Sequence, residues 1–312
     1  MDQKLAIGTD IGGSHISCAA VDLNTGIILK DTLSERAIDN QAQAFQIVSQ
    51  WSSCLQATID KVSSGVALTG IGFAMPGPFD YVNGIALFRG VPKYENLYGF
   101  NIADAIRSSL DLTNEVGLRF MNDASSFAIG ESWSGKSADA ERSVAITLGT
   151  GFGSAFIDKR VPVVDGPLVP KFGCMYHLPF GDSNADSYFS TRWFQAKYKL
   201  LTGREVSGVR ELSEMAAGDT RVREIFNEFG RNLGIFLAPW LKGFGAEVLV
   251  IGGNISHTLN LFGTDLSKTL ADDGCDTTIS VSDLKEDAAL IGSAYLFNEK
   301  FWSSVQHALP LM

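Results

Sequence analysis

Apolar residues gather in short runs near the start of the chain, and two of these runs enclose a glycine pair. Residues 4–10 (KLAIGTD) and 16–22 (ISCAAVD) are such runs, with IGGSH between them. This order predicts a hairpin of two strands with a glycine turn, and residues 27–33 predict a third strand. From Asp39 to Val62 apolar residues recur at helical spacing, namely at Ala42, Phe45, Val48, Trp51, Leu55, Ile59 and Val62.

The rest of the first half alternates between buried strands and helices. GIGFAMPG (70–77) predicts a strand that meets a Pro-Gly break, and residues 101–110 predict a helix. GLRFMND (117–123) predicts a strand that ends in Asn122-Asp123, and ASSFAIGESW (124–133) predicts the helix that follows.

The second half repeats this order, because RSVAITLGTGFGSAFID (142–158) again predicts strand, glycine turn and strand. The elements predicted after it are a Pro- and Gly-rich loop (161–184), helices at 186–201 and 211–245 with a kink or restart at Pro239, a buried strand (246–254) and a closing helix (286–302). Two halves that each begin with a glycine-turn hairpin indicate an internal duplication and two α/β lobes that face one cleft.

Composition and charge narrow the class of protein. The 312 residues are 45% hydrophobic and 19% charged, which is typical of a globular protein with one large or two ordinary domains. No apolar run reaches the roughly 18 residues of a membrane span, and MDQKLAIGTD lacks the apolar stretch of a secretory signal. We therefore expect a cytoplasmic protein without a membrane partner. A formal charge of −10 argues against a surface that covers nucleic acid.

The cysteines do not form a metal-binding pattern. Cys18, Cys54, Cys174 and Cys275 are far apart and include no C-x-x-C pair. Structural zinc needs closely spaced ligands. We expect scattered, buried or half-buried thiols in a reducing cytosol and no structural zinc.

One stretch, GESWSGKS (130–137), matches the P-loop pattern G-x-x-x-x-G-K-[ST] at every fixed position. A P-loop requires a strand before it and a helix that begins at Lys136-Ser137. Here the preceding residues have helical spacing, and the following ones form a short polar connection. We therefore interpret Gly130 as the end of a helix and Lys136 as a solvated loop lysine. The alternative, a P-loop phosphotransferase that uses Lys136, predicts that Lys136→Ala abolishes activity.

Three other glycine stretches are better candidates for binding a nucleotide. In the first, Gly12-Gly13-Ser14, main-chain N–H groups are open to an anion and the Ser14 hydroxyl adds a donor. Asp10, at a strand end, has the oxygen ligands that suit Mg²⁺, usually held through water. The second is Gly149-Thr150-Gly151 with Gly153, and the third is Gly252-Gly253, on which an adenine could lie. Each stretch alone is more typical of an ordinary turn, but the three together favour nucleotide binding.

Asn122-Asp123 is the candidate for the chemical step. The pair lies at the carboxyl end of a predicted strand, where open α/β sheets place their ligand sites. A carboxylate there could accept the proton of a substrate hydroxyl as its oxygen attacks the γ-phosphorus. The alternative is that Asn122 or Asp123 caps the following helix, and both roles are compatible.

These motifs together resemble the ROK family of sugar kinases and sugar-sensing repressors, within the actin-like ATPase-fold superfamily. The matching segments run from end to end of the chain: DIGGSH, GFAMPGPFD (72–80), NDASSFAIGE, TLGTGFG, LVIGGN and DAALIGSA. The resemblance implies two actin-like (ribonuclease H-like) lobes with a cleft between them. We place the first lobe at 1–122 with 290–312 and the second at 123–289.

The resemblance also implies roles for single residues. Asp123 would be the general base, and the first two glycine stretches would bind the phosphates of ATP, with Mg²⁺ at Asp10. The residues implied at the sugar are Gly77, Asn122, Asp123, His177 and Asp186. Members of the family often form homodimers, and FNEFGRNLGIFLAPWL offers apolar surface for a dimer, although its periodicity fits a core helix equally well.

The chain departs from the family pattern in two places. The first loop of the family usually reads Gly-Gly-Thr-Lys, whereas Ser14-His15 follows the glycines here. The family then usually has Glu and His, a cysteine zinc cluster and a second Glu. Here Cys174 stands at the first Glu, His177 matches the His, the cluster is missing and Asp186 stands at the second Glu. The identity of the sugar therefore stays open. His177 taken alone fits an ordinary loop or core histidine as well as a residue that contacts the sugar.

The resemblance implies an ATP- and Mg²⁺-dependent carbohydrate kinase, with a hexose or amino-hexose phosphorylated at C6 as the family default. The alternative is a catalytically weak sugar-binding or regulatory relative. The repressors of the family carry an N-terminal helix-turn-helix domain, and the first strand here begins too close to Met1 for one. We therefore expect no direct DNA binding.

Overall fold

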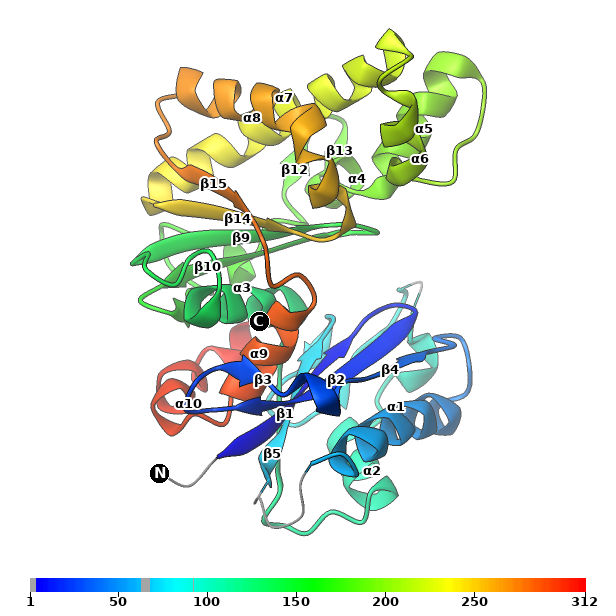
Figure 1. Ribbon diagram of the computed structural model, residues 1–312, viewed down its shortest axis with the longest axis vertical. Coiled ribbons are helices and arrows are strands. Elements are labelled where there is room, and N and C mark those ends of the chain that lie inside the picture. The colour runs from blue at the N-terminus through cyan, green and yellow to red at the C-terminus, as the bar shows by residue number, and fades with distance from the viewer. Residues whose placement is uncertain (1–3, 63–67, 92) are drawn as a thin grey trace. The chain divides into compact units, whose positions relative to one another are not determined.

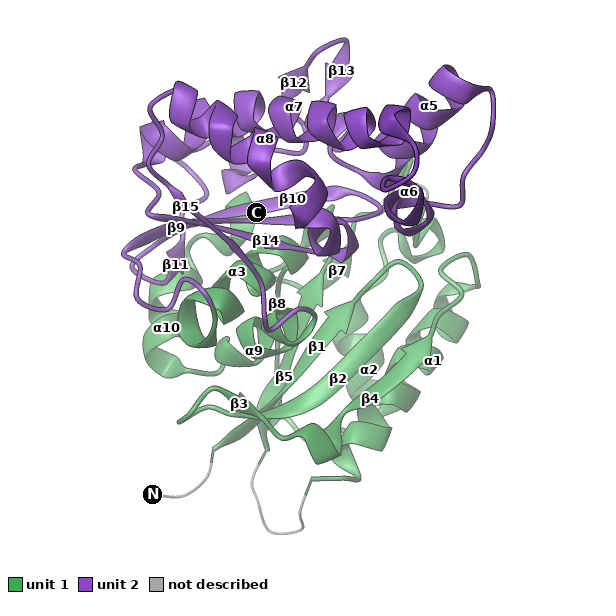
Figure 2. Cartoon of the chain, turned by 45° about the horizontal axis from the view of Figure 1, so that its top comes forward, with its two compact units in different colours: residues 1–135, 286–312 green, residues 136–285 purple. Residues whose placement is uncertain are grey.

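The computed structural model describes residues 4–62, 68–91 and 93–312. The chain divides into two compact units, Met1–Gly135 with Glu286–Met312 and Lys136–Lys285 (Figure 2). Residues 1–3, with which the expected first lobe begins, lie outside the described residues. Helix α3 belongs to the first unit, whereas the lobe boundary that we drew from the sequence would assign it to the second.

The first unit is built on a mixed sheet with the strand order β3-β2-β1-β5-β8, and β4 also pairs with β2 (Figure 1). Strands β1 and β2 are antiparallel, and β1, β5 and β8 are parallel. The strands are β1 (Leu5–Ile11), β2 (His15–Asp22), β3 (Ile27–Ile28), β4 (Ser34–Ala37), β5 (Leu68–Met75) and β8 (Gly117–Asn122), with a small hairpin of β6 (Phe79–Asp80) and β7 (Ile85–Ala86). The helices are α1 (Ala44–Ile59), α2 (Ile102–Ser109), α3 (Asp123–Ser134), α9 (Asp287–Tyr295) and α10 (Glu299–Val305), with 3-10 turns η1 (Lys30–Thr32), η2 (Glu95–Leu97) and η5 (Leu309–Leu311).

The second unit repeats this plan, because its sheet has the order β11-β10-β9-β14-β15 with an antiparallel β9–β10 hairpin and parallel β9, β14 and β15. The strands are β9 (Arg142–Leu148), β10 (Phe152–Asp158), β11 (Val161–Pro162), β14 (Val248–Gly252) and β15 (Thr278–Val281), with a hairpin of β12 (Pro179–Phe180) and β13 (Ser183–Asn184). The helices are α4 (Ala185–Tyr188), α5 (Thr191–Thr202), α6 (Val209–Met215), α7 (Thr220–Phe244) and α8 (Leu259–Asp272), with 3-10 turns η3 (Lys171–Gly173) and η4 (Asn254–Thr258). The duplication expected from the two hairpins is thus present in the strand order.

Helix α9 packs on the first sheet at backbone distance. A Cβ atom at Gly8 of β1 would lie 1.9 Å from the Leu290 carbonyl oxygen, and one at Gly72 of β5 would lie 1.9 Å from that of Ser293. Helix α1 covers the other face of the sheet. Cys54 of α1 contacts Cys18 of β2, and Cys18 pairs with Thr9 of β1. Because side chains alternate along a strand, Cys18 and Thr9 point away from the face on which Gly8 meets α9.

Helices α3 and α9 also cross at backbone distance. A Cβ atom at Gly292 would lie 1.8 Å from the Ser126 carbonyl oxygen, and one at Gly130 would lie 2.0 Å from that of Ala288. The prediction that Gly130 ends its helix is therefore wrong. Helix α3 continues to Ser134, and Gly130 is needed because α9 leaves no room for a side chain there.

Several predicted elements differ from the structure in their bounds. The third strand ends at Ile28, because the Thr32 hydroxyl accepts the Ala20 N–H (2.8 Å) in place of a strand partner while the chain makes a 3-10 turn. Helix α1 starts at Ala44 rather than Asp39, after a capping box at Gln43.

The later helices divide differently from their predictions. Predicted helix 186–201 is α4 and α5, 211–245 is α6 and α7, and 286–302 is α9 and α10, while the predicted loop 161–184 holds β11, η3, β12 and β13. Helix α7 runs through Pro239 without ending, and the carbonyl that loses its N–H donor belongs to Ile235, a residue that is 54% exposed. Neither α8 nor β15 was predicted from the sequence.

The apolar stretch 226–241 lies mainly in the core of the second unit. Its large side chains Phe226, Phe229, Leu233, Leu237 and Leu241 are fully buried there. This packing explains the periodicity of the stretch, which therefore no longer supports a dimer surface at these positions.

We predict that Gly292→Ala lowers the free energy of unfolding by about 3 kcal/mol, because the added methyl group meets backbone rather than a movable side chain. Urea denaturation measures the change. Gly243→Ala in α7 is the matched control, since nothing lies within 4 Å of its Cβ position, and it should be neutral or stabilising by about 0.5 kcal/mol. Equal stability of the two variants would show that α9 does not depend on this close approach.

Candidate functional site

The first glycine turn joins β1 to β2 and presents open main-chain donors. The Gly12 N–H closes the turn by donating to the His15 carbonyl (3.0 Å). The next two N–H groups, of Gly13 and Ser14, have no acceptor in the part of the chain that the structure describes. Successive open N–H groups form a concavity that suits an anion, and the exposed Ser14 hydroxyl lies beside them.

The carbonyl groups of this turn are held from outside. Tyr94 donates its hydroxyl to the Gly12 carbonyl, and Asn40 donates its side-chain amide to that of Gly13. The Ile38 N–H donates to the Ser14 carbonyl (2.8 Å). Burial holds the pKa of Tyr94 above its ordinary value, so the hydroxyl stays protonated and can donate. The three bonds fix the turn while its N–H groups remain available.

Asn122 and Asp123 were both candidates for the helix cap and for the chemical step, and the structure gives them different hydrogen bonds. Asn122 is the N-cap of α3, and its side-chain oxygen accepts the Ser125 N–H (3.1 Å). Asp123, the first residue of α3, is half-buried, and its Oδ1 accepts from the Asn122 amide (3.1 Å) and the Ala124 N–H (2.8 Å). Within the described residues its Oδ2 has no hydrogen-bond partner. Asn122 therefore caps the helix, and one carboxylate oxygen of Asp123 stays available.

Asp10, at the end of β1, lies in a concentration of negative charge. Burial first, and then the carboxylates of Asp123 and Glu286, raise the pKa of Asp10 to about 7, while Lys93 opposes the shift. Charges act on one another in this way only over short distances. The structure therefore brings together two carboxylates, Asp10 and Asp123, that are far apart in the sequence.

Gly77 lies just beyond the end of β5, at the third strand end of this sheet edge, and is exposed. A buried tyrosine, Tyr81, connects this segment to the pair above. Its hydroxyl donates to the Met75 carbonyl (3.2 Å) and lies 3.4 Å from the Asn122 amide nitrogen. Tyr81 thus links the ends of β5 and β8.

The second glycine turn, between β9 and β10, is one residue shorter than the first but also leaves main-chain donors open. The Gly149 N–H donates to the Gly151 carbonyl (3.0 Å), and the N–H groups of Thr150 and Gly151 have no acceptor among the described residues. Thr191 donates its N–H (2.8 Å) and its hydroxyl (3.0 Å) to the Gly149 carbonyl. Gly153 follows within β10. Each unit therefore carries one turn with two open N–H groups.

Asp186, at the start of α4, braces this second turn. Its Oδ1 accepts the Phe152 N–H (2.9 Å), and its Oδ2 forms an ion pair with Arg192 (2.5 Å). A Cβ atom at Gly151 would lie 2.9 Å from Oδ1, so Gly151 leaves room for the carboxylate. Both oxygens of Asp186 are thus engaged within the protein.

His177 and Cys174 lie in the segment that leads to α4. The Nδ1 atom of His177 is buried and has no partner among the described residues. Burial and the charge of Lys171 lower the pKa of His177, which favours a neutral ring at pH 7. Burial, Cys174 and Asp186 raise the pKa of Tyr176, which places these three side chains near one another.

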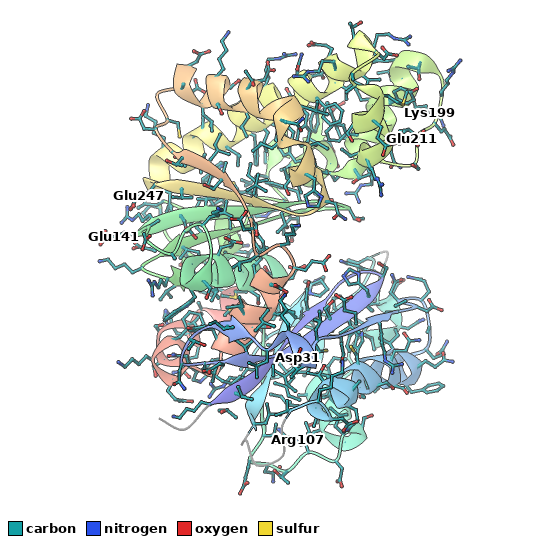
Figure 3. The ribbon with its side chains drawn as sticks, viewed as in Figure 1. Asp31, Arg107, Glu141, Lys199, Glu211 and Glu247 are labelled. Atoms are coloured by element: carbon teal, nitrogen blue, oxygen red, sulfur yellow. The ribbon has the colours of Figure 1, made fainter. Side chains whose placement is uncertain are left out.

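The third glycine stretch follows β14. Gly253 has a positive φ of 79°, and a Cβ atom there would lie 2.4 Å from the Leu148 carbonyl oxygen. Gly252 and Gly253 thus lie beside the end of β9, on the same sheet edge as the second turn. Glu141 and Glu247, directly before β9 and β14, mark the opposite edge (Figure 3).

The P-loop pattern does not have a P-loop structure. Helix α3, rather than a strand, leads into it, and Lys136 and Ser137 lie in a turn. Lys136 forms an ion pair with Asp283. The rejection of a P-loop is confirmed, although the helix ends at Ser134 rather than at Gly130 and Lys136 is paired rather than simply solvated.

The described residues lack a metal cluster, a disulfide and a membrane-spanning helix. No group of three or more His, Cys, Asp or Glu side chains there could hold a metal ion. The four cysteines are free thiols, of which Cys174 alone is only half-buried. No helix in this part of the chain is long and apolar enough to cross a bilayer.

The residues that brace the two turns were not predicted from the sequence. Tyr94 and Asn40 at the first turn and Arg192 at the second are ordinary polar residues in or near loops. They match no motif, and Tyr94 and Asn40 bond to residues that are distant in the sequence. Only the tertiary structure could identify them.

Comparisons with known proteins agree with this arrangement. The model of the ROK family matches residues 6–300. A glucokinase from Thermotoga maritima is 25% identical, with 96% of this chain and 99% of that protein covered, and a beta-glucoside kinase from Listeria innocua is 26% identical, with 92% and 95% covered. The fold is that of the ROK hexokinase from Thermus thermophilus (TM-score 0.78, 20% identity, 96% and 99% covered) and of a ROK family glucokinase from Streptomyces griseus in complex with glucose and AMPPNP (TM-score 0.71, 23% identity, 95% and 99% covered).

We predict that the raised pKa of Asp10 makes the protein less stable as the pH rises from about 4 to about 7. In this window the folded state retains a proton that the unfolded state has lost, so the contribution present below pH 4 disappears. Asp10→Asn should therefore match the wild type near pH 4 and exceed its free energy of unfolding by about 2 kcal/mol at pH 8, in buffer with a chelator.

Asp80→Asn provides a control of opposite sign for this measurement. Hydrogen bonds from Asn83 and Val82 lower the pKa of Asp80, so its carboxylate stabilises the fold above its unfolded pKa. Its replacement should lower stability at pH 8. Parallel pH profiles for the wild type and Asp10→Asn would contradict the electrostatic account.

Proposed function

This chain belongs to the ROK family, and from that premise we propose that it is an ATP-dependent carbohydrate kinase, which transfers the γ-phosphate to a hydroxyl group of a hexose or amino-hexose. Among its relatives, the names glucokinase and beta-glucoside kinase support a sugar as the acceptor. The AMPPNP in the Streptomyces griseus glucokinase supports ATP as the donor.

The observation that carries the proposal is the position of Asp123. Its carboxylate lies at the carboxyl end of β8, with Oδ1 held by the Asn122 amide and the Ala124 N–H. The available Oδ2 would accept the proton of the sugar hydroxyl as that oxygen attacks the γ-phosphorus. Phosphoryl transfer needs little beyond positioning, charge neutralisation and such a base.

The two glycine turns would bind phosphate oxygens of ATP. Gly12, Gly13 and Ser14 form one turn, and Gly149, Thr150 and Gly151 form the other, each with two open N–H groups. Gly153 would keep the second strand free of a side chain beside its turn. Gly252 and Gly253 would provide a flat surface for the adenosine.

The charge around the end of β1 would attract a magnesium ion. Asp10 is half-buried, and the carboxylates of Asp123 and Glu286 do not form a ligand cluster with it but add negative charge that favours a hard divalent cation nearby. Asp10 would hold the ion, usually through water. When bound, Mg²⁺ would neutralise charge on the phosphates.

The residues proposed to contact the sugar are Gly77, Asn122, Asp123 and His177. His177 supports this assignment, because its buried Nδ1 atom needs a hydrogen-bond partner. Asp186 would contribute mainly through the second turn, since the Phe152 N–H and Arg192 already engage its oxygens. Together with Cys174, this arrangement favours a sugar different from that of relatives with two glutamates. We further propose that the protein forms a homodimer, that it acts in the cytoplasm and that it contains no structural zinc.

A sugar-binding protein with weak catalysis is the second candidate. The specific observation in its favour is that Cys174 offers no carboxylate and that Asp186 is engaged within the protein. Stabilisation by sugars and ATP in a thermal-shift assay, without release of ADP, would identify such a protein.

We predict that Asp123→Asn reduces sugar phosphorylation by about 10²- to 10⁴-fold, because an amide cannot accept the hydroxyl proton. A coupled assay of ADP release over a panel of hexoses and amino-hexoses measures the loss, and circular dichroism verifies the fold. Asp104→Asn is the matched control, since Asp104 is also an acidic residue in the first turn of its helix and is exposed. Undiminished phosphorylation by Asp123→Asn would falsify the assignment of the base.

A further inference from the structure

We propose that Lys93 is the cation of the first phosphate turn, where it binds a phosphate oxygen of the nucleotide alongside the open N–H groups of Gly13 and Ser14. The inference rests on the proposed kinase function and adds a residue that no motif of the sequence contains. It also explains how this chain could do without the lysine of the resembled Gly-Gly-Thr-Lys motif, since His15 stands at that position here.

The side chain of Lys93 lies over the glycine turn. A Cβ atom at Gly13 would lie 3.5 Å from Lys93 Cδ and 4.0 Å from its Nζ, and, apart from the chain neighbours of Gly13, no other atom of the described residues comes within 4 Å of that position. The absence of a side chain at Gly13 therefore keeps open the space beneath the ammonium group. An anion held by the Gly13 and Ser14 N–H groups would lie within reach of that charge.

The segment that carries Lys93 is anchored to the same turn. The neighbouring Tyr94 is fully buried, donates its hydroxyl to the Gly12 carbonyl and donates its N–H to the Asn40 carbonyl (3.1 Å). Asn40 in turn donates its side-chain amide to the Gly13 carbonyl. Trp51 packs edge-on against the Tyr94 ring, with the centroids 5.5 Å apart. The backbone of Lys93 is thus fixed relative to the turn, which reduces the entropy lost when the ammonium group binds a ligand.

The charge of Lys93 is not used in an ion pair. Among the residues that the structure describes, no Asp or Glu forms a salt bridge with it, whereas Lys30 pairs with Asp287 and Lys136 with Asp283. The Lys93 side chain is also only half-exposed. A cation that is partly withdrawn from water and has no paired carboxylate is suited to an anionic ligand.

The side chain of His15 does not reach over the turn, so it does not take the place of the lysine that the resembled motif has at this position. Its Cε1 atom would lie 3.1 Å from a Cβ atom at Gly12, so the ring packs against the turn itself. Its Nδ1 atom lies 3.5 Å from the Ser14 hydroxyl oxygen. Lys93 therefore approaches the turn at Gly13, while His15 lies against it at Gly12.

Calorimetric titration of three variants with Mg-ADP and with pyrophosphate tests the proposal without requiring turnover. Lys93→Met, which keeps the apolar stem, should weaken the binding of both anions roughly 10- to 100-fold. Lys93→Arg should stay within about threefold of the wild type, because it retains the charge. Lys136→Met is the matched control and should bind like the wild type, since Lys136 is paired with Asp283 in a turn after α3.

Steady-state kinetics and thermal unfolding separate this role from a structural one. Lys93→Met should raise KM for ATP, leave KM for the sugar within about twofold and unfold close to the wild-type temperature, since the ammonium group forms no hydrogen bond or ion pair with the described residues. Wild-type anion affinity in Lys93→Met, or an increase confined to the sugar KM, would overturn the assignment. If the wild type binds pyrophosphate but phosphorylates no sugar, the kinase proposal fails while Lys93 remains testable; if it binds neither anion, both fail.

Discussion

The backbone contact between α9 and its surroundings is the constraint on which the first unit depends. Gly8, Gly72 and Gly130 each meet a carbonyl of α9 at a distance that excludes any side chain, and Gly292 of α9 meets α3 in the same way. These contacts hold β1, β5 and α3 against α9 at backbone distance. Asp10 is the second-last residue of β1, and Asp123 is the first residue of α3, so the same packing brings the two carboxylates together.

The chemistry at this sheet edge depends on the main-chain hydrogen-bond donors that have no partner in the described fold. Carbonyl groups of the first turn are bonded outward to Tyr94, Asn40 and Ile38, while the N–H groups of Gly13 and Ser14 remain open. The second turn repeats the arrangement with Thr191 and Asp186 as its braces. Pre-organised donors of this kind need no rearrangement to receive an anion, which makes them effective in phosphoryl transfer.

The sequence predicted the elements that have strong periodicity and a clear end. Both hairpins, β5, β8 and the helix after Asn122 were predicted, because apolar runs and turn residues define them locally. The sequence could not distinguish Gly130 as a packing residue from a helix end, because the deciding neighbour, Ala288, is distant in the chain. It also could not show that Asp186 supports a turn, or that Lys93 lies over Gly13.

These failures share one physical cause. A residue's role in the site depends on which donors and acceptors its neighbours have already used, and only tertiary structure records that. Asn122 is an example, since its side chain caps α3 and also holds Asp123. Motif spacing predicted that the pair matters, whereas the division of roles between its members came from the hydrogen bonds.

The most direct test of the account is the response of individual main-chain amides to nucleotide, measured by ¹H–¹⁵N NMR on the labelled protein with Mg-ADP. If the glycine turns bind phosphate, the amide signals of Gly13, Ser14, Thr150 and Gly151 should shift more than those elsewhere, and those of Lys136 and Ser137 should stay in place. Shifts centred on Lys136 and Ser137, with the four turn amides unchanged, would contradict it.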